Sequence, residues 1–208
     1  MNSKINLRRK ETRGIRKKRS EIKELLMLMI LNRKGPIGRY RLKEMLNLSE
    51  HEGVIRYMLT DLQNQSYVSA SKLGCALTQK GKALLEKRLR AYDIIDIKTF
   101  YTPILTTTPI SMGLHIQNKA DKIESAMKLR DHAVRGGAVG ATIILFKDEK
   151  LIIPSVNIGF FSRHPTLAKK IHDAFSLENN DILVVVSTEE EWRGMEASIT
   201  IAKVLSNK

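Results

Sequence analysis

Apolar residues recur at three- and four-residue spacing through the first third of the chain, which is the period of helices buried along one side. Gly35 and Pro36 interrupt the pattern once. Ser49 and Glu52 have the spacing of a capping box, in which each side chain binds the other residue's main-chain amide at a helix start. The expected helices are Glu21–Leu31, Arg39–Leu46 and Glu50–Gln65.

The third of these helices divides into an apolar and a polar face. Its expected core stripe is Val54, Ile55, Met58, Leu59 and Leu62. The opposite face carries Arg56, Thr60 and Gln63 and is open to a partner.

Two short β-prone runs follow, Tyr67–Ala70 and Leu73–Leu77. Ser71 and Lys72 join them, so we expect a hairpin with Lys72 near its tip. Thr78 is a good N-cap for a last basic helix. Three helices, a hairpin and a helix form the element order of a winged helix-turn-helix, which we place at residues 20–92.

The second half of the chain alternates strands and helices. The threonines before Pro109 favour an extended boundary, so residues 93–109 are expected to be a linker and residues 110–208 a second domain. The expected elements are a strand Ile110–Gln117, a helix Lys119–Arg135, a hairpin of Ala141–Phe146 with Leu151–Pro154, an extended segment Val156–Phe161, a helix Thr166–Phe175, a strand Ile182–Ser187 and a helix that ends near Leu205. The first of these helices should be capped by Asn118, end at Gly136 as a left-handed C-cap, and bury Ile123, Met127 and Val134. Pro165 opens the second helix, and Ser187 with Glu190 caps the last one.

These elements predict an α+β chain. An N-terminal winged helix-turn-helix is followed by a ferredoxin-like or similar β-α-β-β-α-β domain, of the kind that regulators use to dimerise or to sense a ligand.

The net positive charge of the chain lies entirely in residues 1–92, which comprise the tail and the first domain. Residues 1–92 hold 22 Lys and Arg against 8 Asp and Glu, whereas residues 93–208 hold 14 of each. Concentrated positive charge beside a helix-turn-helix pattern favours a polyanionic partner, because phosphate binding requires it. Nucleic acid, and duplex DNA first, is therefore the expected partner.

Residues 1–19 form a basic tail with too few apolar residues to fold alone. The tail is either an arm along the phosphates or in a minor groove, or a solvated extension. The residues expected to contact DNA are Arg8, Arg9, Arg13, Arg16, Lys17, Lys18, Arg19, Arg39, Arg41, Lys43, His51, Arg56, Thr60 and Lys72.

The third helix itself is not basic. Its charges are Glu50, Glu52, Arg56 and Asp61, so charge alone does not draw it to DNA. It either enters a major groove, where Arg56 can bind a guanine with two hydrogen bonds, or packs against a protein partner.

The sequence of the second half shows no catalytic or metal-binding pattern. Gly136–Ala141 is glycine-rich but runs from a helix into a strand, the reverse of a phosphate-binding order. The five histidines show no ligand spacing with Cys75 or a carboxylate. We therefore expect no enzyme, no metal and no cofactor, with a C-terminal enzyme as the weakest alternative. Arg130, Asp131 and Arg135 either line an effector pocket or are ordinary surface charges.

Cellular location follows from similar considerations. Cys75 is the one cysteine, no apolar run approaches the roughly 18 residues of a membrane span, and the basic start lacks the apolar core of a secretory signal. A reduced cytoplasm fits best.

Two motifs resemble a group of archaeal proteins that join a winged helix to a C-terminal domain of unassigned function. They are Leu77-Thr78-Gln79-Lys80-Gly81 in the first half, and Leu129 to Thr142 followed by Leu151-Ile152-Ile153-Pro154 in the second. The resemblance implies a protein like a transcription regulator and transfers no ligand and no catalytic residue.

Together these features predict a homodimeric, DNA-binding transcriptional regulator with a possible small-molecule effector. The alternative is a chromatin or RNA-binding protein that is indifferent to sequence.

Overall fold

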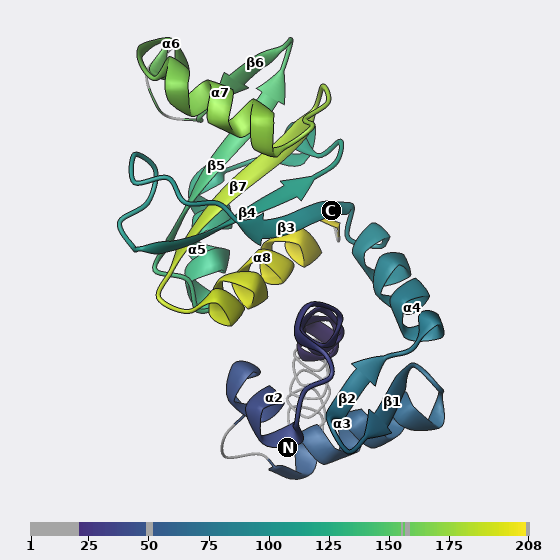
Figure 1. The fold of residues 1–208 in the computed structure, drawn as a ribbon. Helices are drawn as coiled ribbons and strands as arrows, with labels where there is room; N and C mark the ends of the chain where they lie inside the picture. The colour runs from purple at the N-terminus through teal and green to yellow at the C-terminus, as the bar shows by residue number, and fades with distance from the viewer. Residues whose placement is uncertain (1–20, 49–51, 155, 157–158, 207–208) are drawn as a thin grey trace, which may run out of the picture. The chain divides into compact units, whose positions relative to one another are not determined.

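The structure is a computed structural model that describes residues 21–48, 52–154, 156 and 159–206. The chain divides into two compact units, with the boundary between Lys87 and Arg88 (Figure 1). Among the described residues, none of the helices combines the length and apolar character that crossing a bilayer requires.

The first unit is helical with one hairpin. Residues 21–34 form a helix. The elements that follow are α2 (Arg39–Met45), α3 (Glu52–Asn64), β1 (Val68–Ser71), β2 (Gly74–Leu77) and α4 (Gln79–Arg90), which crosses the boundary between the units. The expected capping box at Ser49 lies outside the described residues.

Helix α3 buries a narrower stripe than the apolar pattern predicts. Its buried side chains are Ile55, Met58, Leu59 and Leu62, and Val54 is 46% exposed. Val54 is one residue, or about 100° of helix rotation, away from Ile55, which places it at the margin of the buried face.

The hairpin has the predicted strands with its turn one residue later. Val68 pairs with Leu77 and Ser71 with Gly74, so Lys72 and Leu73 form the turn. Ile37 forms a two-hydrogen-bond bridge with Cys75, at 2.9 Å each way. A Cβ on Gly74, whose φ is +125°, would lie 2.4 Å from the Ile37 carbonyl carbon, so only glycine fits.

The start of α4 explains the Thr-x-Lys-Gly motif. Gly81 N–H donates to Thr78 Oγ1 at 3.0 Å, which confirms the predicted N-cap, and the same hydroxyl donates to the Ser66 carbonyl at 2.7 Å. A Cβ on Gly81 would lie 2.0 Å from the Tyr67 carbonyl oxygen. Lys80 Nζ donates to the Gln65 carbonyl at 3.0 Å. The motif therefore fastens α4 to the end of α3.

The second unit is an open antiparallel sheet of five strands in the order β3-β4-β7-β5-β6. Its strands are β3 (Ile94–Thr99), β4 (Ile110–Ile116), β5 (Gly140–Lys147), β6 (Lys150–Ile152) and β7 (Asp181–Thr188). Its helices are the 3-10 turn η1 (Ala120–Lys122), α5 (Ala126–Arg135), α6 (Phe160–Arg163), α7 (Pro165–Ala174) and α8 (Glu191–Ser206).

Helices cover both faces of this sheet (Figure 1). Helix α7 packs its Leu167 and Ile171 on one face, against Leu183 and Val185 of β7. Helices α5 and α8 lie on the other face. All eight residues of β7 are buried, as expected for a central strand covered on both sides.

Helix α8 approaches the sheet closely at Gly194, where a Cβ would lie 2.7 Å from both Met112 and Thr188.

The α+β class is confirmed, but the ferredoxin-like arrangement is not what the structure has. A ferredoxin-like sheet places two strands of its βαββαβ unit side by side in parallel, whereas every pairing here is antiparallel. The last strand, β7, lies between β4 and β5, which both run opposite to it.

The residues expected to be a linker contain β3, an edge strand that pairs with β4. Ile94 and Ile97 are buried, while Ile95 is 53% exposed. Residues 94–99 are therefore a partly buried strand of the sheet, where a linker was expected. The threonines before Pro109 lie in the connection from β3 to β4.

The helix expected from Lys119 to Arg135 is shorter. Residues 120–122 form η1, and α5 begins after Ser125, whose hydroxyl accepts from Lys128 N–H. Leu129 and Ala133 face inward, whereas Met127 and Val134 are exposed. The left-handed glycine is Gly137, one residue after Gly136, which has an α-helical φ of −79°.

Two further expectations are wrong. Phe160 and Phe161 begin helix α6 and do not extend the sheet. Ser187 lies within β7, and the side chain at the start of α8 that binds main chain is Thr188, which accepts from Glu190 N–H at 3.3 Å. The strand Asp181–Thr188 and the helix opened by Pro165 agree with the sequence.

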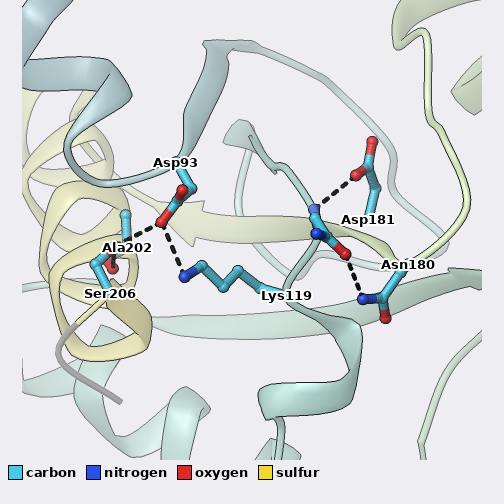
Figure 2. Close-up of polar contacts among 7 residues, drawn as sticks. Asp93, Lys119, Asn180, Asp181, Ala202 and Ser206 are labelled. Atoms are coloured by element: carbon cyan, nitrogen blue, oxygen red, sulfur yellow. Dashed lines mark hydrogen bonds and ion pairs between the residues drawn. The ribbon is translucent and has the colours of Figure 1, made fainter.

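Polar side chains fasten the end of the sheet where β4 leaves and β7 begins (Figure 2). Lys119 Nζ lies 3.0 Å from Asp93 Oδ2, which also accepts from Ser206 of α8 at 3.3 Å. Asn180 donates to the Asn118 side-chain oxygen at 2.6 Å, and Asn118 N–H donates to Asp181 at 2.8 Å. These contacts join β3, β4, β7 and α8 and have a structural role.

Candidate nucleic-acid interface

Helix α2 presents three of the predicted cations. Arg41 is exposed, and Arg39 and Lys43 are half-buried. The Arg39 guanidinium lies 5.5 Å and the Lys43 ammonium 5.6 Å from the centre of the Tyr40 ring, which is 66% exposed. The ring attracts both cations and holds them along this helix.

Glu52, at the start of α3, connects the two helices. Its Oε1 lies 3.3 Å from Arg39 of α2 and 3.6 Å from Arg56, one turn further along α3. We refer to Glu52, Arg39 and Arg56 as the Glu52 cluster. The three side chains are 36 to 65% exposed, so each ion pair contributes little and a phosphate can replace the carboxylate.

The exposed face of α3 carries Arg56 and Thr60, as predicted, together with Tyr57. Tyr57 is 73% exposed. It was not among the residues expected to contact DNA, although its place outside the apolar stripe was a sufficient signal. An exposed phenol between two candidate contact residues offers a hydroxyl for a phosphate and a ring for a base methyl group.

Lys72 lies in the turn of the β1–β2 hairpin and is exposed. The Ser71 hydroxyl fixes this turn by accepting from Leu73 N–H and donating to the Gly74 carbonyl, both at 3.2 Å. Leu73 is 78% exposed beside it. The turn therefore presents a cation and an apolar side chain from a defined backbone, and Leu73 was also missed in the sequence.

In the described part of the chain, neither Arg41 nor Lys72 makes an ion pair, whereas Arg39 and Arg56 share Glu52. The first two cations are thus open to a phosphate without any rearrangement. The tail residues Arg8, Arg9, Arg13, Arg16, Lys17, Lys18 and Arg19, and His51, lie outside the described residues.

Cys75 lies within this unit, on β2. Burial raises the pKa of its thiol, and a hydrogen bond from Gln63 Nε2 at 3.8 Å and the charge of Arg39 act in the opposite direction. The described residues contain no cluster of His, Cys, Asp or Glu able to hold a metal ion.

The three candidate effector residues are all exposed on α5. Arg130 lines a hollow of about 260 Å³ in the second unit, and the lining does not include Asp131 or Arg135. Of the three candidate effector residues, Arg130 lines the hollow, whereas Asp131 and Arg135 do not.

Comparison with known proteins finds a similarity to a protein family in the second unit. Residues 109–205 match the model of a domain of unknown function (DUF4443). No curated protein matches the chain. A hypothetical protein from Pyrococcus horikoshii OT3 has a similar structure, with a TM-score of 0.68 and 24% sequence identity over 89% of this chain and 92% of that one. The chain thus has the fold of an archaeal protein, and residues 109–205 are similar to a domain of unknown function.

Proposed function

We propose that this protein is a DNA-binding regulator of transcription whose first unit is a winged helix-turn-helix. In this proposal α3 enters the major groove, α2 and the β1–β2 turn contact flanking phosphates, and the basic tail adds further phosphate contacts. The second unit dimerises, as many regulators require for two-fold DNA sites.

The Glu52 cluster is the observation that carries the proposal. It gathers two arginines from different helices on the exposed side of α3, next to the aromatic rings of Tyr40 and Tyr57 in sequence. Arginine and tyrosine are the side chains that serve both phosphate and base contacts. The net positive charge of the chain lies in the same half of the sequence.

The test begins with selection of preferred sites from a random duplex library by the full chain. A regulator should prefer its best site over random duplex by about 1,000-fold or more. Contact with about five phosphates predicts that log affinity falls with log salt at a slope of roughly −4.5. A flat salt response contradicts DNA binding itself.

Two variants separate base contacts from phosphate contacts. Arg56→Gln should relax the preference at one base position, with a loss of about 1–3 kcal/mol at the preferred site only. Arg41→Gln should weaken binding to all duplexes alike and reduce the salt slope by about 0.9. Lys169→Gln, an exposed lysine of the second unit that loses the same charge, is the matched control and should change neither.

A second candidate function is sequence-indifferent binding to duplex DNA or RNA. It is favoured by the acidic residues of α3, because Glu52 already occupies Arg56 and Asp61 is also exposed. Equal competition by random duplex and structured RNA, with a retained salt slope, would select this candidate over the regulator.

A further inference from the structure

The hollow beside Arg130 lies at the edge of the sheet in the second unit. Its volume is about 260 Å³. Strand β5, helices α5 and α6, and the loops at residues 104–105 and 153–154 surround it. The lining side chains that matter here are Ile104, Met127, Arg130, Ala141, Ile143 and Phe160. With the exception of Arg130, these are apolar.

The edge of β5 is unpaired at the hollow. β5 pairs with β7 along Gly140–Phe146, but with β6 only along Leu145–Lys147. In the described structure no strand therefore covers the other edge of residues 140–144. β6 lies beside only the end of β5 that leads into the turn (Figure 1).

The main-chain N–H and C=O groups of Ala141 and Ile143 point to this unpaired edge. The Phe146 carbonyl accepts from Asn180 N–H on the β7 side, at 2.8 Å. Because successive residues of a strand direct their main-chain groups to alternate edges, those of Ala141 and Ile143 point away from β7. The hollow thus offers polar main-chain groups beside an apolar wall.

Arg130 supplies the charge. It is exposed, and no carboxylate of the described residues pairs with it. Arg130 is the one charged residue among the described residues that line the hollow. A guanidinium that lacks a partner at the rim of an apolar hollow is complementary to a carboxylate attached to an apolar body.

We propose that the hollow binds a small carboxylic acid with an apolar body. The carboxylate contacts Arg130, the apolar body packs against Ile143 and Phe160, and the free edge of β5 supplies the remaining hydrogen bonds. At about 30 Å³ for each water molecule displaced, the volume corresponds to roughly nine non-hydrogen atoms. The inference concerns the second unit and does not depend on DNA binding.

The experiment titrates the full ¹⁵N-labelled chain with benzoate, phenylacetate and hexanoate and follows the amide resonances of Ala141 and Ile143. We expect saturable binding by at least one acid, with shifts concentrated at these two amides. Benzamide, which has the shape of benzoate without its charge, should bind at least about 10-fold more weakly than benzoate.

Two variants test the site with a matched control. Arg130→Gln should weaken the acid's binding at least about 10-fold, whereas Arg135→Gln, which removes the same charge from the same helix outside the hollow, should leave it within about 2-fold. Ala126→Leu, at the start of α5, should fill part of the hollow and abolish binding while the chain stays folded. The proposal is overturned if none of the three acids binds saturably up to about 10 mM, or if the Arg130 and Arg135 variants bind equally well.

Discussion

At the scale of single residues, Glu52 pairs with two of the arginines that the first unit presents. Its one carboxylate contacts Arg39 and Arg56, so removal of its charge frees two arginines at once. Asp61 lies on the same helix, is exposed, and accepts a hydrogen bond from Gln65 at 2.9 Å. It therefore provides a comparison in which the same charge is lost without release of an arginine.

Glu52→Gln should bind DNA about 3- to 10-fold more tightly than the native chain, because phosphates no longer compete with a carboxylate for Arg39 and Arg56. Asp61→Asn should also bind DNA more tightly, but its increase in log affinity should be less than half of the increase for Glu52→Gln. The measurement is fluorescence anisotropy with a labelled duplex at constant salt. An equal gain in both variants would mean that only net charge matters.

Asp181 is a buried polar residue of the second unit with three hydrogen-bond partners for its carboxylate. Its carboxylate is 2% exposed, lies 2.7 Å from His115 Nε2, and accepts from Asn118 N–H at 2.8 Å and Glu178 N–H at 2.9 Å. Removal of such an acceptor leaves buried donors without a partner.

Asp181→Ala should therefore lower the free energy of unfolding by about 3 kcal/mol or more. Asp121→Ala removes an aspartate that is 70% exposed and pairs with Lys147, and should cost less than about 1 kcal/mol. Urea denaturation followed by circular dichroism measures both. Similar losses in the two variants would contradict the role given to Asp181.

Cys75 gives a dependence on pH. Because burial raises the pKa of its thiol, folding favours the protonated form. This contribution to stability is complete below the ordinary thiol pKa and is lost as pH rises above about 9. The free energy of unfolding should therefore fall more steeply between about pH 8.5 and 10 in the native chain than in Cys75→Ala, and parallel curves would refute the effect.

At the scale of elements, the fit of α7 on the sheet depends on one glycine. A Cβ on Gly113 of β4 would lie 2.3 Å from Phe175 Cζ and 3.1 Å from Phe100 Cβ. The Phe175 ring is itself packed edge-on against Phe100 at 5.2 Å and lies beneath the Lys98 ammonium at 4.5 Å. The ring has little room to move.

Gly113→Ala should thus destabilise the chain by about 1–3 kcal/mol through overpacking. Gly140→Ala, in β5, has no atom within 4 Å of the added Cβ and should change the free energy of unfolding by less than about 0.5 kcal/mol. Thermal and urea denaturation of both variants provide the comparison. A neutral Gly113→Ala would show that the α7 face is loosely packed.

Elements with strong local signals were predictable from the sequence. The hairpin strands, the Thr78 cap and the Pro165 helix each have a residue or pattern that specifies them. Helix α5 was misplaced because residues 119–125 have no strong breaker and the true N-cap, Ser125, competes with Asn118. β3 was missed because its two buried isoleucines are three apart, a spacing that also suits a helix.

The order of strands in the sheet was not predictable in this way. Alternation of apolar residues shows that a strand is buried, but pairing partners are set by contacts between distant segments. Similarly, Arg130 was a candidate from sequence, whereas the hollow beside it depends on where β6 leaves β5. Tyr57 and Leu73 were missed because the residues expected to contact DNA were limited to arginines, lysines, His51 and Thr60.

At the scale of the whole molecule, charge is divided along the chain and most of it is at the start. Residues 1–19 hold nine Lys and Arg against one Glu, which is +8 of the net +14. If the tail contacts phosphates, the salt dependence of DNA binding should depend on it more than on any other segment.

Replacement of Arg8, Arg9, Arg13, Arg16, Lys17, Lys18 and Arg19 by Gln in the full chain should make the salt slope shallower by about 0.9 for each phosphate that the tail no longer neutralises. A tail of scrambled sequence and unchanged composition is the control and should retain the slope if the tail acts through charge alone. Affinity measured between about 50 and 300 mM salt gives both slopes. An unchanged slope in the Gln variant would make the tail a solvated extension.

The central strand of the sheet, β7, is also its last strand in the chain. During synthesis β4 and β5 leave the ribosome long before Asp181–Thr188, the segment that must be inserted between them. Until then both of their inner edges lack a partner, and such edges readily pair with other chains. A nascent chain stalled before residue 181 should therefore expose two unpaired strand edges, and the second unit can complete its sheet only once β7 has been synthesised.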